Sequence, residues 1–310
     1  MKKQADLEAR QSIKKELDIA LCADLNMEAP LHVAAASVLR RASGAFQIRF
    51  NFLLPNFNDA SKKRLRETLD GIKRPYSVQF LQTPKAELFR GLKPFHGNMT
   101  CYYRFAFPEL IEADRFLYID ADTVTRTDIT TITEIPMQSY ALGAVATGTV
   151  SQAKERKFFK KLGLPDSTPE FNSGVLLVDV QEWRRQKRSS EIFEFCRRYP
   201  NELAGDQTAL VGVFAGNFLQ LPACFNIPLY ADTPLKKNED GICHFVGSPK
   251  PWDLFGNVMH LAYSVYREDL EETSFAAQPP AFFELQKWRR AYHVKGGYYR
   301  TVRNRLFRNT

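Results

Sequence analysis

The chain has 310 residues, of which 44% are hydrophobic and 25% are charged, and its formal net charge is +8. This length suits one large domain with a small appendage, and the ordinary composition excludes a largely disordered chain. No apolar run approaches the ~18 residues of a membrane-spanning helix, and the charged start at 1–10 lacks the apolar core of a signal peptide. Five cysteines without a C-x-x-C pair predict neither a disulfide framework nor a zinc site, as expected for a reduced, cytoplasmic protein.

Apolar runs alternate with helical patterns along the chain. Strands are expected at 17–23, 46–53, 76–81, 116–120, 141–146, 171–178 and 242–245. Helices are expected at about 30–41, 61–69 and 102–110, and residues 181–199 predict one long basic surface helix. Strands alternating with helices predict an α/β fold with a mostly parallel central sheet that is covered by helices.

Two carboxylates, Asp120 and Asp122, end the apolar run 116–119. Side chains two residues apart on a strand point the same way, so both carboxylates can face one cation. The ends of strands are where open α/β sheets bind ligands. Hard oxygen ligands suit Mg²⁺ or Mn²⁺, which neutralise phosphates. Taken alone, an Asp-x-Asp pair also fits a turn or a helix cap.

Four further segments carry polar side chains at predicted strand ends or at a helix start. They are Asp24-Leu-Asn26, Phe171-Asn-Ser-Gly174, Gly205-Asp-Gln-Thr208 and the stretch from His244 to Trp252. The last segment supplies an imidazole, a flexible backbone and the Lys250 ammonium within seven residues. An ion that needs three protein ligands would find them in Asp120, Asp122 and His244, with sites left for phosphate oxygens.

Taken in order, these motifs resemble those of the family 8 retaining glycosyltransferases over roughly residues 17–260. The motifs are A-D-x-N, Y-x-R-F, Y-I-D-A-D, F-N-S-G-V, D-Q and H-F-x-G-x-x-K-P-W. That family includes bacterial lipooligosaccharide galactosyltransferases and lipopolysaccharide core hexosyltransferases. The resemblance implies a nucleotide-sugar-binding fold of the GT-A type, with Mn²⁺ (or Mg²⁺) and a UDP-hexose donor, either galactose or glucose.

The resemblance also implies a role for each matched residue. Asp120, Asp122 and His244 would ligate the metal. Asp24 and Asn26 would contact uracil and ribose, and Gly247 and Lys250 would contact the diphosphate. Ala121, between the two aspartates, would also belong to the donor site. The residues around the sugar would be Arg104, Asn172, Asp206 and Gln207. Arg104, Asp206 and Gln207 would form the catalytic set, and His96 matches a position near the donor and acceptor sugars.

The position of Gln207 bears on how the sugar's configuration is retained. Retaining glycosidases use a carboxylate nucleophile, whereas the amide oxygen of Gln207 is a poor one. We therefore favour attack on the same face of the sugar, with the leaving phosphate accepting the acceptor's proton.

Other functions remain open. A nucleotide-sugar-binding protein without transferase activity would not need intact metal ligands. A metal-dependent phosphohydrolase or nuclease would not need the K-P-W and F-N-S-G segments. A transferase that acts on a protein or another glycan also remains possible.

Residues 281–310 carry most of the net charge. They hold eight Lys or Arg against one acid, Glu284, a net of +7, while the other 280 residues hold 35 basic and 34 acidic groups, a net of +1. Seven aromatic residues are interleaved with these charges, and the segment from Trp288 is similar to the C-terminal extension of the lipopolysaccharide core transferases. Basic residues mixed with aromatics favour an anionic membrane surface, although a solvated helix with packing aromatics also fits. Nucleic-acid binding is disfavoured because the nearly neutral body has no continuous basic face.

We therefore expect a catalytic domain at 1–268 and a basic C-terminal extension at 281–310, joined by a linker near 269–280. The protein would be peripheral at the inner face of the cytoplasmic membrane, with a lipid-linked or lipopolysaccharide saccharide as acceptor. Because the predicted metal and donor residues precede residue 260, a chain ending near Glu272 should keep UDP-hexose turnover.

Overall fold

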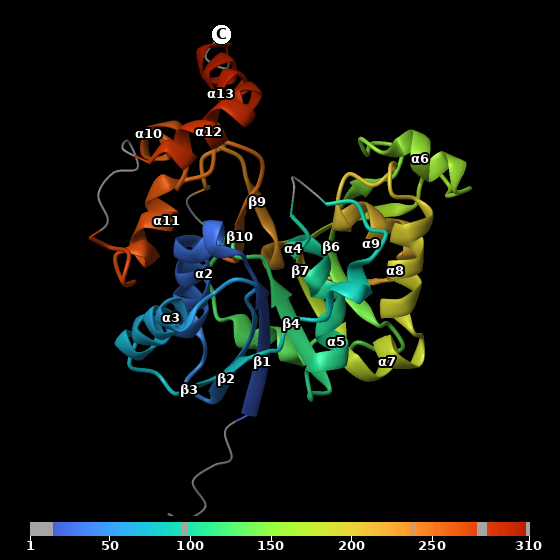
Figure 1. Ribbon diagram of the computed structural model, residues 1–310, viewed down its shortest axis with the longest axis horizontal. Helices are drawn as coiled ribbons and strands as arrows, with labels where there is room; N and C mark the ends of the chain where they lie inside the picture. Colours follow the sequence, from blue (N-terminus) through green and yellow to red (C-terminus); the bar gives the residue numbers. More distant parts are fainter. Residues whose placement is uncertain (1–14, 95–97, 237–238, 278–283, 308–310) are drawn as a thin grey trace, which may run out of the picture.

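The structure is a computed structural model that describes residues 15–94, 98–236, 239–277 and 284–307, and all structural statements concern these ranges. A central sheet lies between two groups of helices, and the C-terminal helices lie at one end of the molecule beside α10 (Figure 1). None of the described helices is both long and apolar enough to cross a bilayer.

The central sheet of the described chain has seven strands. In spatial order they are β3 (Tyr76–Phe80), β2 (Phe46–Leu53), β1 (Lys15–Cys22), β4 (Arg115–Ile119), β7 (Pro169–Asp179), β6 (Leu142–Thr149) and β8 (Leu219–Gln220). The pairs β2–β3, β1–β2, β1–β4 and β6–β8 are parallel, and only the two pairings of β7 are antiparallel. The predicted α/β fold with a mostly parallel sheet is confirmed.

Helices cover both faces of this sheet because the strand residues alternate in direction. On β1, Leu17, Ile19 and Leu21 belong to one apolar cluster, whereas Ala20 and Cys22 belong to the other. The first cluster includes side chains of α2 (Glu28–Arg41) and α3 (Asp59–Gly71), and the second includes those of α5 (Phe107–Leu110), α7 (Val180–Arg185), α8 (Arg188–Arg198) and α9 (Asp206–Phe214).

A second, three-stranded sheet brings distant parts of the chain to the end of β4. It consists of β5 (Thr123–Thr125), β10 (Ile242–Phe245) and β9 (Ile227–Leu229). β10 pairs antiparallel with β5, with His244 opposite Thr123, and the Phe245 amide donates to the Asp122 carbonyl at 2.9 Å. This pairing carries His244 to the turn between β4 and β5, which holds Asp120 and Asp122.

Two predicted helices differ from the structure. The expected helix 181–199 is wrong as a single element, because Lys187 has a left-handed φ of 53° that separates α7 from α8. This break lets Trp183 of α7 and Ile192 of α8 enter the same apolar cluster. The expected helix 102–110 is three short pieces, in which Pro108 at the start of α5 lacks the N–H that would continue a helix from the preceding turn.

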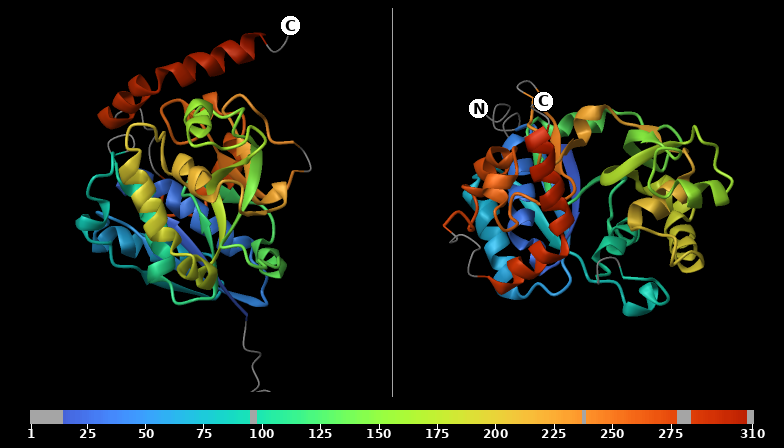
Figure 2. Two further views of the ribbon diagram at one scale, coloured as in Figure 1. Left: turned by 90° about the vertical axis from the view of Figure 1, so that its right-hand side faces the viewer. Right: turned by 90° about the horizontal axis from the view of Figure 1, so that it is seen from above.

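The remaining elements are short or lie near the C-terminus. The 3₁₀ turns are Leu25–Met27, Ala86–Phe89, Arg104–Ala106, Ile129–Glu134 and Ala223–Phe225, and the other helices are α4 (Thr100–Tyr103), α6 (Arg156–Lys161), α10 (Gly256–Met259), α11 (Tyr263–Leu270), α12 (Leu285–His293) and α13 (Lys295–Phe307). Figure 2 shows α12 and α13 lying along one side of the molecule.

The start of the expected linker is part of the folded body. The buried carboxylate of Asp269 accepts hydrogen bonds from Arg40 and Arg41 of α2, each at 2.8 Å. The ring of Phe275 packs edge-on against His32 with centroids 4.7 Å apart. The expectation that a linker begins at Asp269 is therefore wrong, and residues 278–283 lie outside the described chain.

Candidate active site

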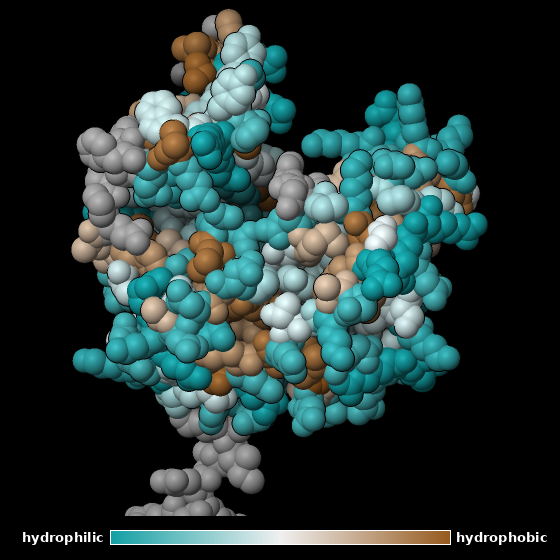
Figure 3. Space-filling model, in the orientation of Figure 1, coloured by the Kyte–Doolittle hydropathy of each residue, from teal (hydrophilic) through white to brown (hydrophobic). Residues whose placement is uncertain are grey.

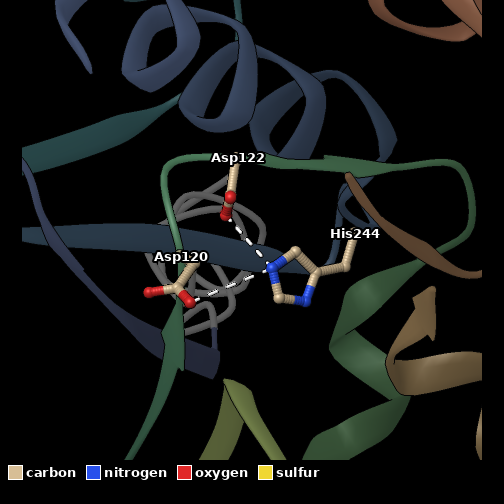
Figure 4. A group of neighbouring side chains, drawn as sticks. All are labelled: Asp120, Asp122 and His244. Carbon is tan, nitrogen blue, oxygen red and sulfur yellow. Dashed lines mark ion pairs between the residues drawn. The ribbon is translucent and has the colours of Figure 1, made fainter. Parts of the chain in front are cut away.

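The predicted metal ligands come together at the carboxyl end of β4. Figure 3 shows the molecular surface hollowed between the part that carries α12 and α13 and the part that carries α6. The side chains of Asp120, Asp122 and His244 point toward one another (Figure 4). His244 Nε2 lies 3.2 Å from Asp122 Oδ1 and 4.0 Å from Asp120 Oδ2, and one ligand atom from each residue lies within 4.8 Å of the others.

The side-chain amides of Asn226 and Asn172 hold the His244 ring in an orientation in which Nε2 can bind a metal. His244 Nδ1 lies 3.1 Å from Asn226 Oδ1, and Asn226 Nδ2 donates to Asn172 Oδ1 at 2.9 Å. Because the Asn226 oxygen is an acceptor, Nδ1 donates to it, and Nε2 is the ring nitrogen that faces the two carboxylates. Two carboxylates and an imidazole nitrogen oriented in this way fit a divalent cation.

Asn226 is a site residue that the sequence analysis missed. It precedes β9, a strand of three residues, and no motif marks it. Its only sequence signal is its position before an apolar segment, Ile227–Leu229, which pairs with the His244 strand.

The glycine of the F-N-S-G motif makes room for the imidazole. A side chain at Gly174 would overlap the His244 ring. The Gly174 carbonyl accepts a hydrogen bond from the Asp120 amide at 2.7 Å, and its amide donates to Asn172 Oδ1 at 2.9 Å. Gly174 therefore lies against the His244 ring, the Asp120 backbone and the Asn172 side chain.

Arg104 joins two of the predicted acidic residues. Its Nη2 donates to Asp120 Oδ1 at 2.8 Å, and its Nη1 lies 2.9 Å from Asp206 Oδ2. Burial opposes the charge on Arg104, but the two carboxylates outweigh it and raise its pKa well above the ordinary value. Tyr118 also donates to Asp120 Oδ1 at 2.6 Å, so one oxygen of Asp120 is occupied by protein donors while Oδ2 faces His244.

Lys250 forms an ion pair with Asp122, one of the three candidate metal ligands. Its Nζ lies 2.7 Å from Asp122 Oδ2 and also donates to the Phe245 carbonyl. Burial alone would raise the pKa of Asp122, but Lys250 and then His244 outweigh it and lower that pKa. Burial raises the pKa of Asp120, against the opposing effect of Arg104. The two aspartates therefore have different electrostatic environments.

Gln207 is held at the start of α9 beside the same network. Its Oε1 accepts from Asn172 Nδ2 at 3.2 Å, and its Nε2 donates to Glu170 Oε1 at 3.3 Å. The Ser173 hydroxyl donates to Asp206 Oδ2 at 2.9 Å. Glu170, whose pKa is raised by burial, is a second nearby acid that the sequence analysis did not predict.

The predicted base and ribose residues lie after β1, the parallel neighbour of β4. The Asp24 carboxylate caps the following turn by accepting from the Asn26 amide at 2.9 Å, and it also contacts Asn98. Asn26 Oδ1 accepts from Gln286 Nε2 of α12 at 2.6 Å. Gly247 has a left-handed φ of 73°.

The remaining predicted positions are Ala121 and His96. Ala121 is buried between the two aspartates. His96 lies outside the described residues.

A cluster of carboxylates, an imidazole and two cations lies at the carboxyl end of a mostly parallel sheet, the edge where open α/β folds commonly bind their ligands. The sequence model of glycosyl transferase family 8 matches residues 18–255, and the chain belongs to this family of glycosyltransferases. This confirms the resemblance that its motifs predicted.

Individual relatives and one solved structure are similar to most of this chain. The chain is 25% identical to General stress protein A of Bacillus subtilis over 257 residues, covering 76% of this chain and 87% of the relative. It is 22% identical to the lipopolysaccharide 1,2-glucosyltransferase of Escherichia coli over 279 residues, covering 85% and 80%. The solved structure of the galactosyltransferase LgtC with donor and acceptor sugar analogs superposes with a TM-score of 0.70 at 25% identity, covering 83% of this chain and 96% of that one.

Proposed function

We propose that this protein is a retaining hexosyltransferase that moves galactose or glucose from a UDP-hexose to a saccharide acceptor. The observation that carries this proposal is the convergence of Asp120, Asp122 and His244 with Lys250 within ion-pair distance of Asp122. Family membership supports sugar transfer, and a cation site beside a lysine suits a diphosphate leaving group.

The roles on the donor side follow from position. A Mn²⁺ or Mg²⁺ ion held by Asp120, Asp122 and His244 would stabilise negative charge on the leaving diphosphate. Lys250 would add a charge-assisted hydrogen bond to the same group, with Gly247 giving the phosphates close access to the backbone. Asp24 and Asn26, on the loop after β1, would contact ribose and uracil.

The sugar would lie against the polar network of Arg104, Asn172, Asp206 and Gln207. Cleavage of the anomeric C–O bond leaves positive charge on the sugar ring and negative charge on UDP. Asp206, paired with Arg104 at 2.9 Å, would orient a sugar hydroxyl. The Gln207 amide would contact the sugar on the face opposite the leaving group. The acceptor would then attack on the leaving-group side, and the leaving phosphate would take its proton.

The C-terminal helices support an acceptor at an anionic membrane surface on the cytoplasmic side. Their exposed large hydrophobic side chains are Leu285, Trp288, Tyr292, Tyr299, Val302, Leu306 and Phe307. Arg300 and Arg303 are exposed among them. At ~1 kcal/mol per basic residue near an anionic surface, several such residues suffice for reversible binding. The similarity to a lipopolysaccharide glucosyltransferase supports a lipopolysaccharide core acceptor.

A donor screen tests the proposed reaction. The protein is incubated with Mn²⁺ and each UDP-hexose, with and without truncated lipopolysaccharide, and UDP release and product configuration are measured. We expect slow release alone, faster release with the acceptor, and an α-linked product from an α-linked donor. Binding without turnover would indicate a nucleotide-sugar-binding protein, and hydrolysis of simple phosphoesters would indicate a phosphohydrolase. Either result contradicts the proposal.

Sedimentation with vesicles tests the membrane surface. The full chain should sediment with vesicles of anionic lipid at low salt and be released at high salt, since screening weakens surface attraction. The variant Arg300→Gln/Arg303→Gln should sediment less. Equal sedimentation of both proteins would contradict membrane docking through these helices.

A further inference from the structure

Helix α12 contacts the loop that carries the proposed diphosphate ligand. Arg290 Nε donates to Asp253 Oδ1 at 2.5 Å, and Asp253 Oδ2 accepts from the backbone amide of Lys250 at 2.8 Å. A single carboxylate thus links the C-terminal segment to the residue proposed to bind the diphosphate.

The buried carboxylate of Asp253 is stabilised by its ion pair with Arg290. Its side chain is 1% exposed, whereas that of Arg290 is 44% exposed. Within the described chain, the ion pair found for Asp253 is the one with Arg290. Removing one partner of such a pair leaves an uncompensated buried charge. Without Arg290, the Asp253 carboxylate would lose its ion-pair partner and would turn toward water, which loosens its hold on the Lys250 amide.

Other contacts from the same segment reach the same loop. Lys287 Nζ donates to the Trp252 carbonyl at 2.9 Å, and the Tyr298 hydroxyl donates to the Leu254 carbonyl at 2.5 Å. A side chain at Gly297 would overlap the Ser248 carbonyl, so α13 packs directly on the backbone of this loop. The loop 247–255 is therefore held from outside by the C-terminal helices.

The opposite side of the proposed donor site is also touched by α12. Gln286 Nε2 donates to Asn26 Oδ1 at 2.6 Å. One helix thus contacts both the segment proposed to hold the ribose and uracil and the loop proposed to hold the diphosphate. In Figure 1 this helix lies beside α10.

We propose that Arg290 is a positioning residue for donor binding, which acts through Asp253 on Lys250, so that α12 forms the outer support of the donor site. This inference rests on the proposed role of Lys250 at the diphosphate. It reverses the expectation that a chain ending near Glu272 keeps UDP-hexose turnover, because such a chain would lack this support.

The test uses the full-length protein with Mn²⁺ and compares UDP affinity by calorimetry with KM and kcat for UDP-hexose turnover. Arg290→Gln should weaken UDP binding and raise KM about tenfold while kcat changes less than threefold, since the chemical groups remain in place. Arg289→Gln is the matched control, because it removes the same charge from an exposed neighbour on α12. It should leave UDP affinity and KM unchanged.

A double variant separates positioning from loss of stability. Asp253→Asn keeps an oxygen that can accept from the Lys250 amide but removes the buried charge. Asp253→Asn/Arg290→Gln should therefore bind UDP more tightly than Arg290→Gln alone, a non-additive result that marks the pair as coupled. If the double variant is no better than Arg290→Gln, or if Arg289→Gln weakens UDP equally, the inference is wrong.

The two proposals fail in different ways. If the wild-type chain neither binds UDP nor turns over a UDP-hexose, the proposed function itself is wrong. If the wild type does both and Arg290→Gln matches it in UDP affinity and KM, only the positioning role of Arg290 is wrong.

Discussion

Removal of the Lys250 ammonium should weaken nucleotide binding without weakening metal binding. Lys250 Nζ lies 2.7 Å from Asp122 Oδ2 and its side chain is 13% exposed, so a contact with phosphate would form in a partly desolvated site. A charge-assisted hydrogen bond of this kind contributes about 1.5–3 kcal/mol. Lys250→Ala should therefore weaken UDP binding by roughly 10- to 150-fold.

The same change should leave Mn²⁺ binding intact or strengthen it. The ammonium beside Asp122 repels a cation at the three candidate ligands, and its removal leaves the carboxylate free to bind one. Calorimetric titration at low salt, first with Mn²⁺ alone and then with UDP in saturating Mn²⁺, measures the two effects separately. Lys154→Ala, a change at an exposed lysine, is the matched control.

Two outcomes would refute this reasoning. UDP affinity that is unchanged in Lys250→Ala would show that the lysine does not contact the diphosphate. A parallel loss of Mn²⁺ and UDP binding would show that the substitution disrupts the site as a whole.

Two further predictions concern the packing around the site and the buried histidines. Gly174→Ala should lower Mn²⁺ affinity more than about tenfold, because a methyl group there overlaps the His244 ring. Gly71→Ala, the control, has open space around it and should leave the affinity unchanged. Equal Mn²⁺ affinities of the two variants would contradict the assignment of His244 as a metal ligand. Burial lowers the pKa of His32 to about 3 and that of His260 to about 4. Between pH 7.5 and 5.5 the unfolded state therefore binds more protons, and the free energy of unfolding should fall by about 1.4 kcal/mol for each histidine. In urea denaturation, the free energy of unfolding of His32→Gln should fall between these pH values by about half as much as the two histidines together predict for the wild type. A pH dependence equal to that of the wild type would show that His32 does not contribute.

The main features of the site were readable from the sequence because they are local. Asp120 and Asp122 follow directly on a buried apolar run, so their place at the end of a strand follows from the chain alone. His244 lies on a short strand of its own, and only the family order of the motifs connected it with the aspartates. The pairing of β10 with β5 is what brings it within reach.

The features that the sequence did not reveal depend on contacts between distant segments. Asn226 orients His244, which is 18 residues away in the sequence. Arg290 pairs with Asp253, which is 37 residues away. Composition marks α12 as basic and aromatic but does not say which of its cations face the protein. The break at Lys187 has no local signal, because a left-handed lysine is set by the packing of the two helices that it separates.

The central claim is that a divalent cation held by Asp120, Asp122 and His244 is required to transfer a hexose from UDP. The most direct measurement is UDP release from UDP-galactose and UDP-glucose with Mn²⁺, with EDTA, and with Asp122→Asn beside the exposed control Asp166→Asn. We expect turnover of one donor with Mn²⁺ by the wild type and by Asp166→Asn, and none in EDTA or by Asp122→Asn. Full turnover in EDTA, or by Asp122→Asn, would contradict the account.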